Sequence, residues 1–200
     1  MARIAALLLF AASTSCLAQV PEAAKPFRAD LTRTARAVWG MDAPVATFAG
    51  QIHQESAWKP GAVSRVGAAG LAQFMPATSA WIATIDPELR LNQPFSPAWA
   101  MRALVTYNQW LHVRVRGVDG CNRMAFVLSS YNGGLGWVNR DKALAASKGL
   151  DALRWFDSVE TVNAGRSLAN WQENRAYPRR ILLKHEPVYA KAGWGRGACT

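Results

Sequence analysis

Apolar residues recur at helical spacing along most of this chain, and that periodicity constrains the fold more than any other feature. It is clearest in the segment 44–56, where Val45, Phe48, Ala49 and Ile52 would share one side of a helix entered through a proline. Alternation of apolar and polar residues is scarce, and only a few residues near 158–165 could form a strand. The sequence therefore predicts an all-α fold, or at most an α+β fold with a minimal amount of strand.

Residues that favour helix ends mark further helices. Ser96 followed by Pro97 predicts a long helix with a capping hydroxyl. Asn170 and Glu173 have the spacing of a capping box, and Pro178 is suited to open the last helix. The predicted helices are 30–39, capped by Asp30; 96–116, ended by Gly117 and Gly120; 122–130; and 179–189.

The first eighteen residues are typical of an export signal. Arg3 gives a positive start, residues 4–12 are apolar, and Cys16-Leu17-Ala18 supplies small residues for cleavage. The apolar run is shorter than the roughly 20 residues of a membrane span. We therefore expect a signal peptide over 1–18 and a periplasmic protein. The alternative is an outer-membrane lipoprotein attached through Cys16.

The remainder is interpreted as a short linker followed by one domain. Residues 19–29 contain two prolines and are predicted to be the linker, and residues 30–200 the domain. Without Arg3, 22 basic residues face 13 acidic residues, which leaves a net charge of +9. Such a charge suits an anionic partner, such as a cell-wall polymer, a membrane surface or nucleic acid, and simple solubility is the alternative. We expect no nucleic-acid partner, because no basic cluster is interleaved with aromatic residues.

Two cysteines remain after the signal is removed, Cys121 and Cys199. An even pair in an oxidising compartment can form a disulfide, which here would attach the C-terminal tail to the middle of the domain. Two free thiols are the alternative.

The chemistry points to Glu55, at the end of the apolar helix and just before a glycine-rich segment. A carboxyl group there can be partly desolvated, which raises its pKa and suits a proton donor at neutral pH. An exposed glutamate at a helix end is the alternative that position alone favours.

Three motifs in order change this balance, because they resemble the signature of the lytic transglycosylases, the goose-lysozyme-like family of soluble murein-cleaving enzymes. The first motif includes Ala72 where the family usually has methionine; the second and third have Ser130 and Asn174 where alanine and threonine are usual. The motifs read Glu55-Ser56, Pro60, Ser64, Gly67-Ala68-Ala69-Gly70-Leu71-Ala72-Gln73 and Met75-Pro76-Ala77-Thr78; Ser130-Tyr131-Asn132-Gly133-Gly134; and Glu173-Asn174-Arg175-Ala176-Tyr177.

The resemblance implies a goose-lysozyme-like fold of the lysozyme superfamily and a role for each matching residue. Glu55 would be the single catalytic acid and then base. Ser64 and Tyr177 would supply hydroxyl groups near the reacting N-acetylmuramic acid. The sugar cleft would be lined by Gln73, Met75, Tyr131 and Asn132, with Glu173 holding part of its wall. The alternatives are a turn cap for Ser64, a core position for Met75, helix-end positions for Tyr131 and Asn132, and a capping box for Glu173.

Only one carboxylate, Glu55, is positioned for catalysis, whereas glycosidases ordinarily use a pair of carboxylates. In the family, the acetamido group of the muramic residue and its own 6-hydroxyl replace the second carboxylate, which leaves a 1,6-anhydromuramic end. The resemblance therefore implies a lyase acting on peptidoglycan glycan strands. The alternatives are a hydrolytic muramidase and an inactive wall-binding protein. Opening the wall for a secretion, pilus or conjugation apparatus is one hypothesis for the biological role, and general wall turnover is the other.

No cofactor or metal is expected, because His53, His112 and His185 lack ligand spacing. Asp86 and Glu88 lie outside the motifs and are interpreted as loop charges. Trp58 is a candidate for the cleft, with a core position as the alternative. A monomer is expected.

Overall fold

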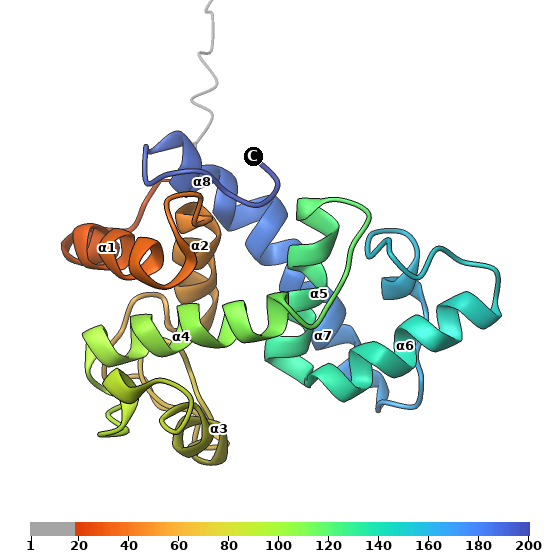
Figure 1. The fold of residues 1–200 in the computed structure, drawn as a ribbon, viewed down its shortest axis with the longest axis horizontal. Helices are drawn as coiled ribbons and strands as arrows, with labels where there is room; N and C mark the ends of the chain where they lie inside the picture. Colours follow the sequence, from red (N-terminus) through yellow and green to blue (C-terminus); the bar gives the residue numbers. More distant parts are fainter. Residues whose placement is uncertain (1–18) are drawn as a thin grey trace, which may run out of the picture.

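A computed structural model describes residues 19–200, and the predicted export signal, including Cys16, lies outside these residues. Helices dominate the described part (Figure 1). In chain order they are η1 Glu22–Phe27, α1 Arg28–Trp39, α2 Val45–Ser56, α3 Pro76–Ile82, η2 Pro87–Leu89, α4 Pro97–His112, α5 Gly120–Gly133, α6 Leu135–Ser147, η3 Val159–Thr161, α7 Leu168–Arg179, the π-helical η4 Arg180–His185 and α8 Glu186–Lys191. The predicted all-α fold class is confirmed.

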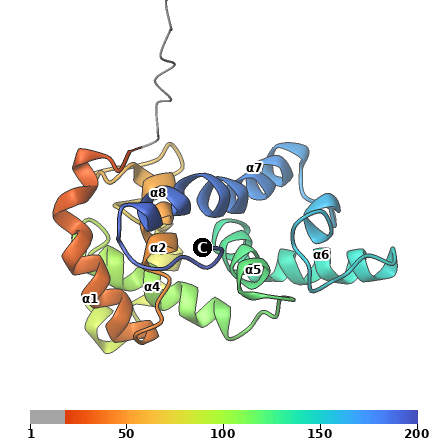
Figure 2. The same ribbon diagram turned by 90° about the horizontal axis from the view of Figure 1, so that it is seen from above.

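The helices form two groups, each with its own apolar cluster (Figures 1 and 2). In the first, α1 packs on α4, and α2 packs on α8 and η4. In the second, α5 packs on both α6 and α7. Three aromatic residues contact both clusters: Trp39, Tyr107 and Tyr131. The long helix α4 joins the groups, because its start lies in the first cluster and Leu111, near its end, in the second.

The predicted linker is not a linker in the structure. Residues 22–27 form η1, which continues directly into α1. Ala24 is fully buried, and the Phe27 ring stacks on Trp58 with centroids 5.8 Å apart. Asp30 therefore lies inside the first turn and does not cap the helix. The sequence pattern missed this because the segment is ordered by burial against distant residues.

Several helix boundaries also differ from the predictions. Helix α4 begins at Pro97 as expected, but the Ser96 hydroxyl makes no capping bond and the helix ends at His112. Ser167, not Asn170, caps α7, since its Oγ accepts a hydrogen bond from the Asn170 backbone N–H. The capping-box interpretation of Glu173 is therefore wrong.

Pro178 does not open a helix; it lies inside α7. The helical path continues through η4 into α8. A proline cannot donate the hydrogen bond of a helix interior, so it was interpreted as a helix start. Here Pro178 lies one residue before the end of α7, and the backbone changes to the π-helical η4 directly after Arg179.

The predicted strand near 158–165 is also wrong, because the 3-10 helix η3 occupies part of it. Bridge pairing in the described chain occurs at Val63 with Ala69 and at Ala69 with Phe74. That pairing lies in the glycine-rich segment after Glu55.

The sulfurs of Cys121 and Cys199 are bonded, with Cα atoms 4.5 Å apart and a sequence separation of 78. The predicted disulfide is therefore present and attaches the tail to the start of α5. Within residues 19–200, no helix is both long enough and apolar enough to span a membrane.

Candidate active site

Glu55 occupies the last turn of α2, and the chain turns sharply after it. Ala57 and Trp58 have positive φ values of 49° and 64°, which end the helix. Trp58 is only 1% exposed, and its Nε1 donates to Tyr189 Oη over 2.6 Å. Trp58 is thus a core residue that fixes the chain direction after Glu55, which settles the choice between cleft and core.

Glu55 is half-buried, and its carboxyl group is bonded to the second helix group. Its Oε1 accepts a hydrogen bond from the Tyr177 hydroxyl, contributed by α7. Burial raises the pKa of Glu55 to about 8, and the negative charge of Glu173 adds to the rise, whereas the Tyr177 bond opposes it. Glu55 is therefore protonated at neutral pH and able to donate a proton.

The segment 61–75 forms one wall of the site and is shaped by its own hydrogen bonds. Ser64 Oγ accepts from the Ala68 backbone N–H at 2.9 Å, so it caps a turn while its own proton stays free to donate. Gln73 has a φ of 48°, and its Nε2 donates to the carbonyls of Ala62 and Gly70. These bonds leave its amide oxygen available as an acceptor.

Gly70 sets how closely this wall approaches the segment before α4. Its φ is 73°, and a Cβ there would lie 1.9 Å from the carbonyl oxygen of Pro94. Only glycine fits that position.

A pocket of about 280 Å³ lies in front of Glu55. The predicted site residues that line it are Glu55, Ser64, Gln73, Met75, Tyr131, Asn132 and Glu173. Tyr177 contacts it through the bond to Glu55. The structure thus brings all eight predicted site residues together from α2, α5, α7 and the segment 61–75. Met75 is 42% exposed, so it is not a core residue.

Aromatic side chains form another part of the pocket. The ring centroid of Tyr131 lies 5.2 Å from that of Tyr107 and 5.5 Å from that of Phe74. Its hydroxyl donates to the carbonyl of Ala72 at 2.8 Å. Burial, with Glu55 and Tyr107 nearby, raises the pKa of Tyr131 well above its usual value, so this hydroxyl stays neutral.

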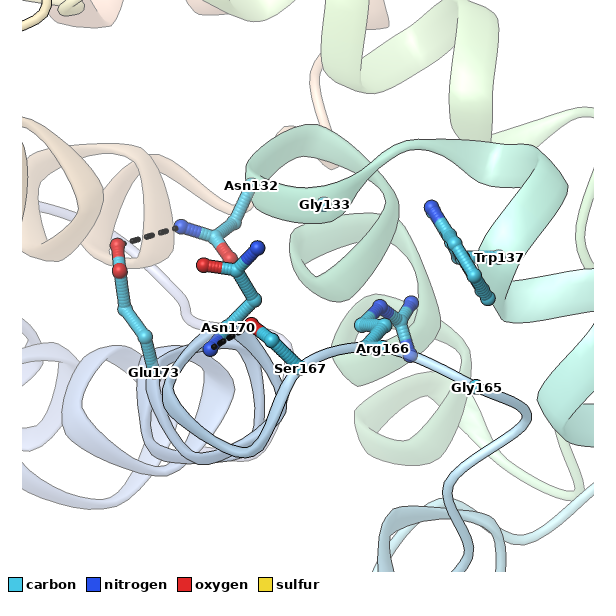
Figure 3. Close-up of a pocket in the computed structure, with 8 residues that line it drawn as sticks. All are labelled: Asn132, Gly133, Trp137, Gly165, Arg166, Ser167, Asn170 and Glu173. Atoms are coloured by element: carbon cyan, nitrogen blue, oxygen red, sulfur yellow. Dashed lines mark hydrogen bonds between the residues drawn. The ribbon is translucent and has the colours of Figure 1, made fainter.

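A second pocket of about 370 Å³, whose lining residues are drawn in Figure 3, shares part of its lining with the first. Asn132 and Glu173 line both pockets and are joined by a hydrogen bond from Asn132 Nδ2 to Glu173 Oε1. Farther along are Trp137 and Arg166, whose guanidinium group lies 5.2 Å from the Trp137 ring centre. The two pockets, which share Asn132 and Glu173 as lining residues, are together called the groove.

Asp86 lies outside this groove. Burial opposes its ionisation, but bonds from Arg102, at 2.7 Å, and from the Glu88 backbone hold the pKa of Asp86 below its usual value. Asp86 is the ion-pair partner of Arg102, and it lies outside both the three motifs and the groove.

Sequence reasoning missed Gln51 and Asn108, both fully buried behind Glu55. Asn108 Nδ2 donates to Gln51 Oε1, and Gln51 Nε2 donates to Tyr177 Oη. One signal was available, because Gln51 is a polar residue four positions before Glu55, a spacing that puts both side chains on the same side of the helix.

Comparisons with known proteins relate this chain to one family. The family model for the transglycosylase SLT domain matches residues 36–153. Membrane-bound lytic murein transglycosylase F of Maricaulis maris is 31% identical over 143 residues, covering 70% of this chain and 29% of the relative. Soluble lytic murein transglycosylase of Salmonella typhimurium is 29% identical over 146 residues, covering 72% of this chain and 22% of the relative.

The fold is also found among solved structures. The 70 kDa soluble lytic transglycosylase of Escherichia coli superposes with a TM-score of 0.55 at 20% identity, covering 84% of this chain and 25% of that one. A complex of the 70 kDa soluble lytic transglycosylase with bulgecin A gives 0.57 at 21% identity, covering 86% and 25%. The chain spans less than a third of the length of these relatives. Since the family model covers more than half of the chain, the chain belongs to the transglycosylase SLT domain family.

Proposed function

We propose that this chain is a peptidoglycan lytic transglycosylase that cleaves the bond from N-acetylmuramic acid to N-acetylglucosamine. The observation that supports this most is the Glu55 carboxyl group, which lines the groove and has a pKa of about 8. It lies where the family's catalytic glutamate is expected.

The proposed reaction needs one acid that later acts as a base. Glu55 donates its proton to the glycosidic oxygen as the bond from that oxygen to C1 breaks. The acetamido group of the muramic residue stabilises the positive charge at C1. The 6-hydroxyl of the same sugar then attacks C1 and returns its proton to Glu55, which leaves a 1,6-anhydromuramic end and a restored acid.

Mass spectrometry of peptidoglycan digests tests the proposal. We expect anhydromuropeptides from the wild type, and a loss of about 10²–10⁴-fold in rate for Glu55→Gln, the usual contribution of a positioned acid. Ser56→Ala is a control from the same helix end, because its hydroxyl bonds only to the carbonyls of Ile52 and Leu71. An active wild type that yields no anhydro ends contradicts the transglycosylase assignment.

Glu173 supports hydrolysis as a second candidate. It lines the same pocket as Glu55 and is close enough to raise its pKa. An ionised Glu173 could activate a water molecule, as a second carboxylate does in inverting glycosidases. Reducing ends in the digest that disappear in Glu173→Gln would identify a muramidase.

We also propose that the chain is exported to the periplasm and acts on wall glycan, locally where a secretion, pilus or conjugation apparatus crosses it. The basic composition supports an anionic wall partner. Cell fractionation with N-terminal sequencing tests the export step, and a mature chain that begins at Gln19 is expected.

A further inference from the structure

Behind Glu55, four polar side chains form one unbroken hydrogen-bonded chain. Asn108 Nδ2 donates to Gln51 Oε1 at 2.7 Å, and Gln51 Nε2 donates to Tyr177 Oη at 3.2 Å. Tyr177 then donates to Glu55 Oε1. The first two members are fully buried and do not contact the groove.

The direction of every bond in this chain follows from one backbone carbonyl. Asn108 Nδ2 lies 2.9 Å from the carbonyl oxygen of Leu104, which can only accept. That terminal atom of Asn108 must therefore be the amide nitrogen, so the Gln51 atom facing it must be oxygen. The other Gln51 terminal atom is then a donor. The Tyr177 oxygen accepts its proton, and the Tyr177 proton is directed to Glu55.

We propose that Gln51 and Asn108 are positioning residues that place the transferable proton of Glu55 on Oε2. A protonated carboxyl group has one oxygen that carries the proton and one that only accepts. Tyr177, fixed as a donor, occupies Oε1 as an acceptor. The proton is then confined to Oε2, the oxygen without a hydrogen-bond partner among the described residues.

Burying these amides is costly, which argues against a purely structural role. Gln51 is fully buried on a helix whose other core-facing residues include Phe48 and Ile52. Asn108 Oδ1 is buried without a partner among the described residues. Apolar side chains of similar size would fill the space without leaving that acceptor unpaired.

The inference rests on the proposed function of Glu55 as the acid, and Gln51→Met tests it at nearly constant volume. Without the Gln51 donor, the Tyr177 oxygen can accept a proton from Glu55, so the proton can lie on Oε1, away from the substrate. We expect kcat to fall about tenfold, the weight of one hydrogen bond, with KM little changed. The pH at which kcat declines on the alkaline side should rise by as much as about one pH unit, because the protonated form of Glu55 gains a hydrogen-bond acceptor.

Other titratable groups face Glu55, and their ionisation must be distinguished from that of Glu55 in the pH profile of kcat. They are Tyr177 and Glu173 from α7, Tyr131 from α5 and, behind Tyr131, Tyr107 from α4. Burial raises the pKa of each of the three tyrosines above its usual value. NMR titration of the Glu55 side-chain carboxyl carbon, read in wild type and Gln51→Met, assigns the shift to Glu55 itself.

Thr47→Val is the matched control, because Thr47 is also buried on α2 and, like Gln51, loses two hydrogen bonds, one donated to Glu186 and one accepted from the Ala198 backbone N–H. It should lower stability without moving the pH profile. Asn108→Leu should raise the pH of the alkaline decline in kcat as Gln51→Met does, but by less. It replaces Gln51→Met as the test if that variant does not fold. In a Tyr177→Phe background, Gln51→Met should not change the Glu55 titration further.

Equal pKa values of Glu55 in wild type and Gln51→Met, or an undiminished effect in the Tyr177→Phe background, would overturn the positioning role. Absence of cleavage by the wild type would instead refute the proposed function. The NMR titration reports the pKa of Glu55 whether or not the protein cleaves glycan, so the two failures are distinguishable.

Discussion

At the scale of single residues, Glu55 is set apart by two opposing influences on its carboxyl group. Burial raises its pKa, and the Tyr177 hydroxyl stabilises the ionised form. Burial has the larger effect, so the acid keeps its proton at neutral pH while remaining hydrogen-bonded in a fixed orientation. A general acid needs both properties.

The pH dependence of activity follows from this. Glu55 must be protonated to start the reaction, so kcat should decline as the pH rises through about 8. A profile on soluble glycan strands measures this. A decline centred in the ordinary carboxyl range, near 4.5, would contradict the assignment.

The same shift makes stability depend on pH. The folded pKa lies above the unfolded value of 4.5, so the folded state binds the proton more tightly. The stabilisation that this proton provides is complete below 4.5 and is lost as the pH rises through about 8. Thermal unfolding of Glu55→Gln should therefore show a gain over wild type that is larger at pH 9 than at pH 5.

At the scale of elements, the segment 61–75 depends on close backbone approach. Gly70 should not tolerate alanine, because its Cβ would clash with the Pro94 carbonyl and its φ of 73° disfavours any side chain. We expect Gly70→Ala to lower the free energy of unfolding by about 2 kcal/mol or more, and to weaken activity by shifting Gln73.

Gly61→Ala is the matched control in the same segment. A Cβ at Gly61 meets no atom within 4 Å, and its φ is not positive. Denaturant unfolding compares the two variants. Equal losses would mean that the approach to Pro94 does not limit this wall.

At the scale of the whole molecule, the disulfide joins the tail to the second helix group. It closes a loop of 78 residues, for which restriction of the unfolded chain is worth about 4 kcal/mol. The tail is held additionally by the buried carboxylate of Glu186, which accepts from the backbone N–H groups of Ala198 and Cys199.

Cys121→Ser, Cys199→Ser and the double variant should lose similar stability, because each removes the same cross-link. Chemical denaturation under non-reducing conditions measures the loss. Losses that add in the double variant would show that the two side chains stabilise the fold separately. Activity at low temperature should persist, since neither cysteine lines the groove.

The sequence alone determined the helical class, the long helix that starts at Pro97 and the eight residues of the candidate site. It could do so because helical periodicity is local. Each of the three family motifs, which carry Glu55, Tyr131 and Tyr177, is also a short segment that can be recognised without knowing the fold. The tertiary structure alone decided what depends on distant contacts. Burial against Trp58 orders the predicted linker, Trp58 itself lies in the core, and the path runs through Pro178 without a break. Gln51 and Asn108 are 57 positions apart, and their bond exists only because the fold brings these two positions of α2 and α4 together, which no local pattern encodes.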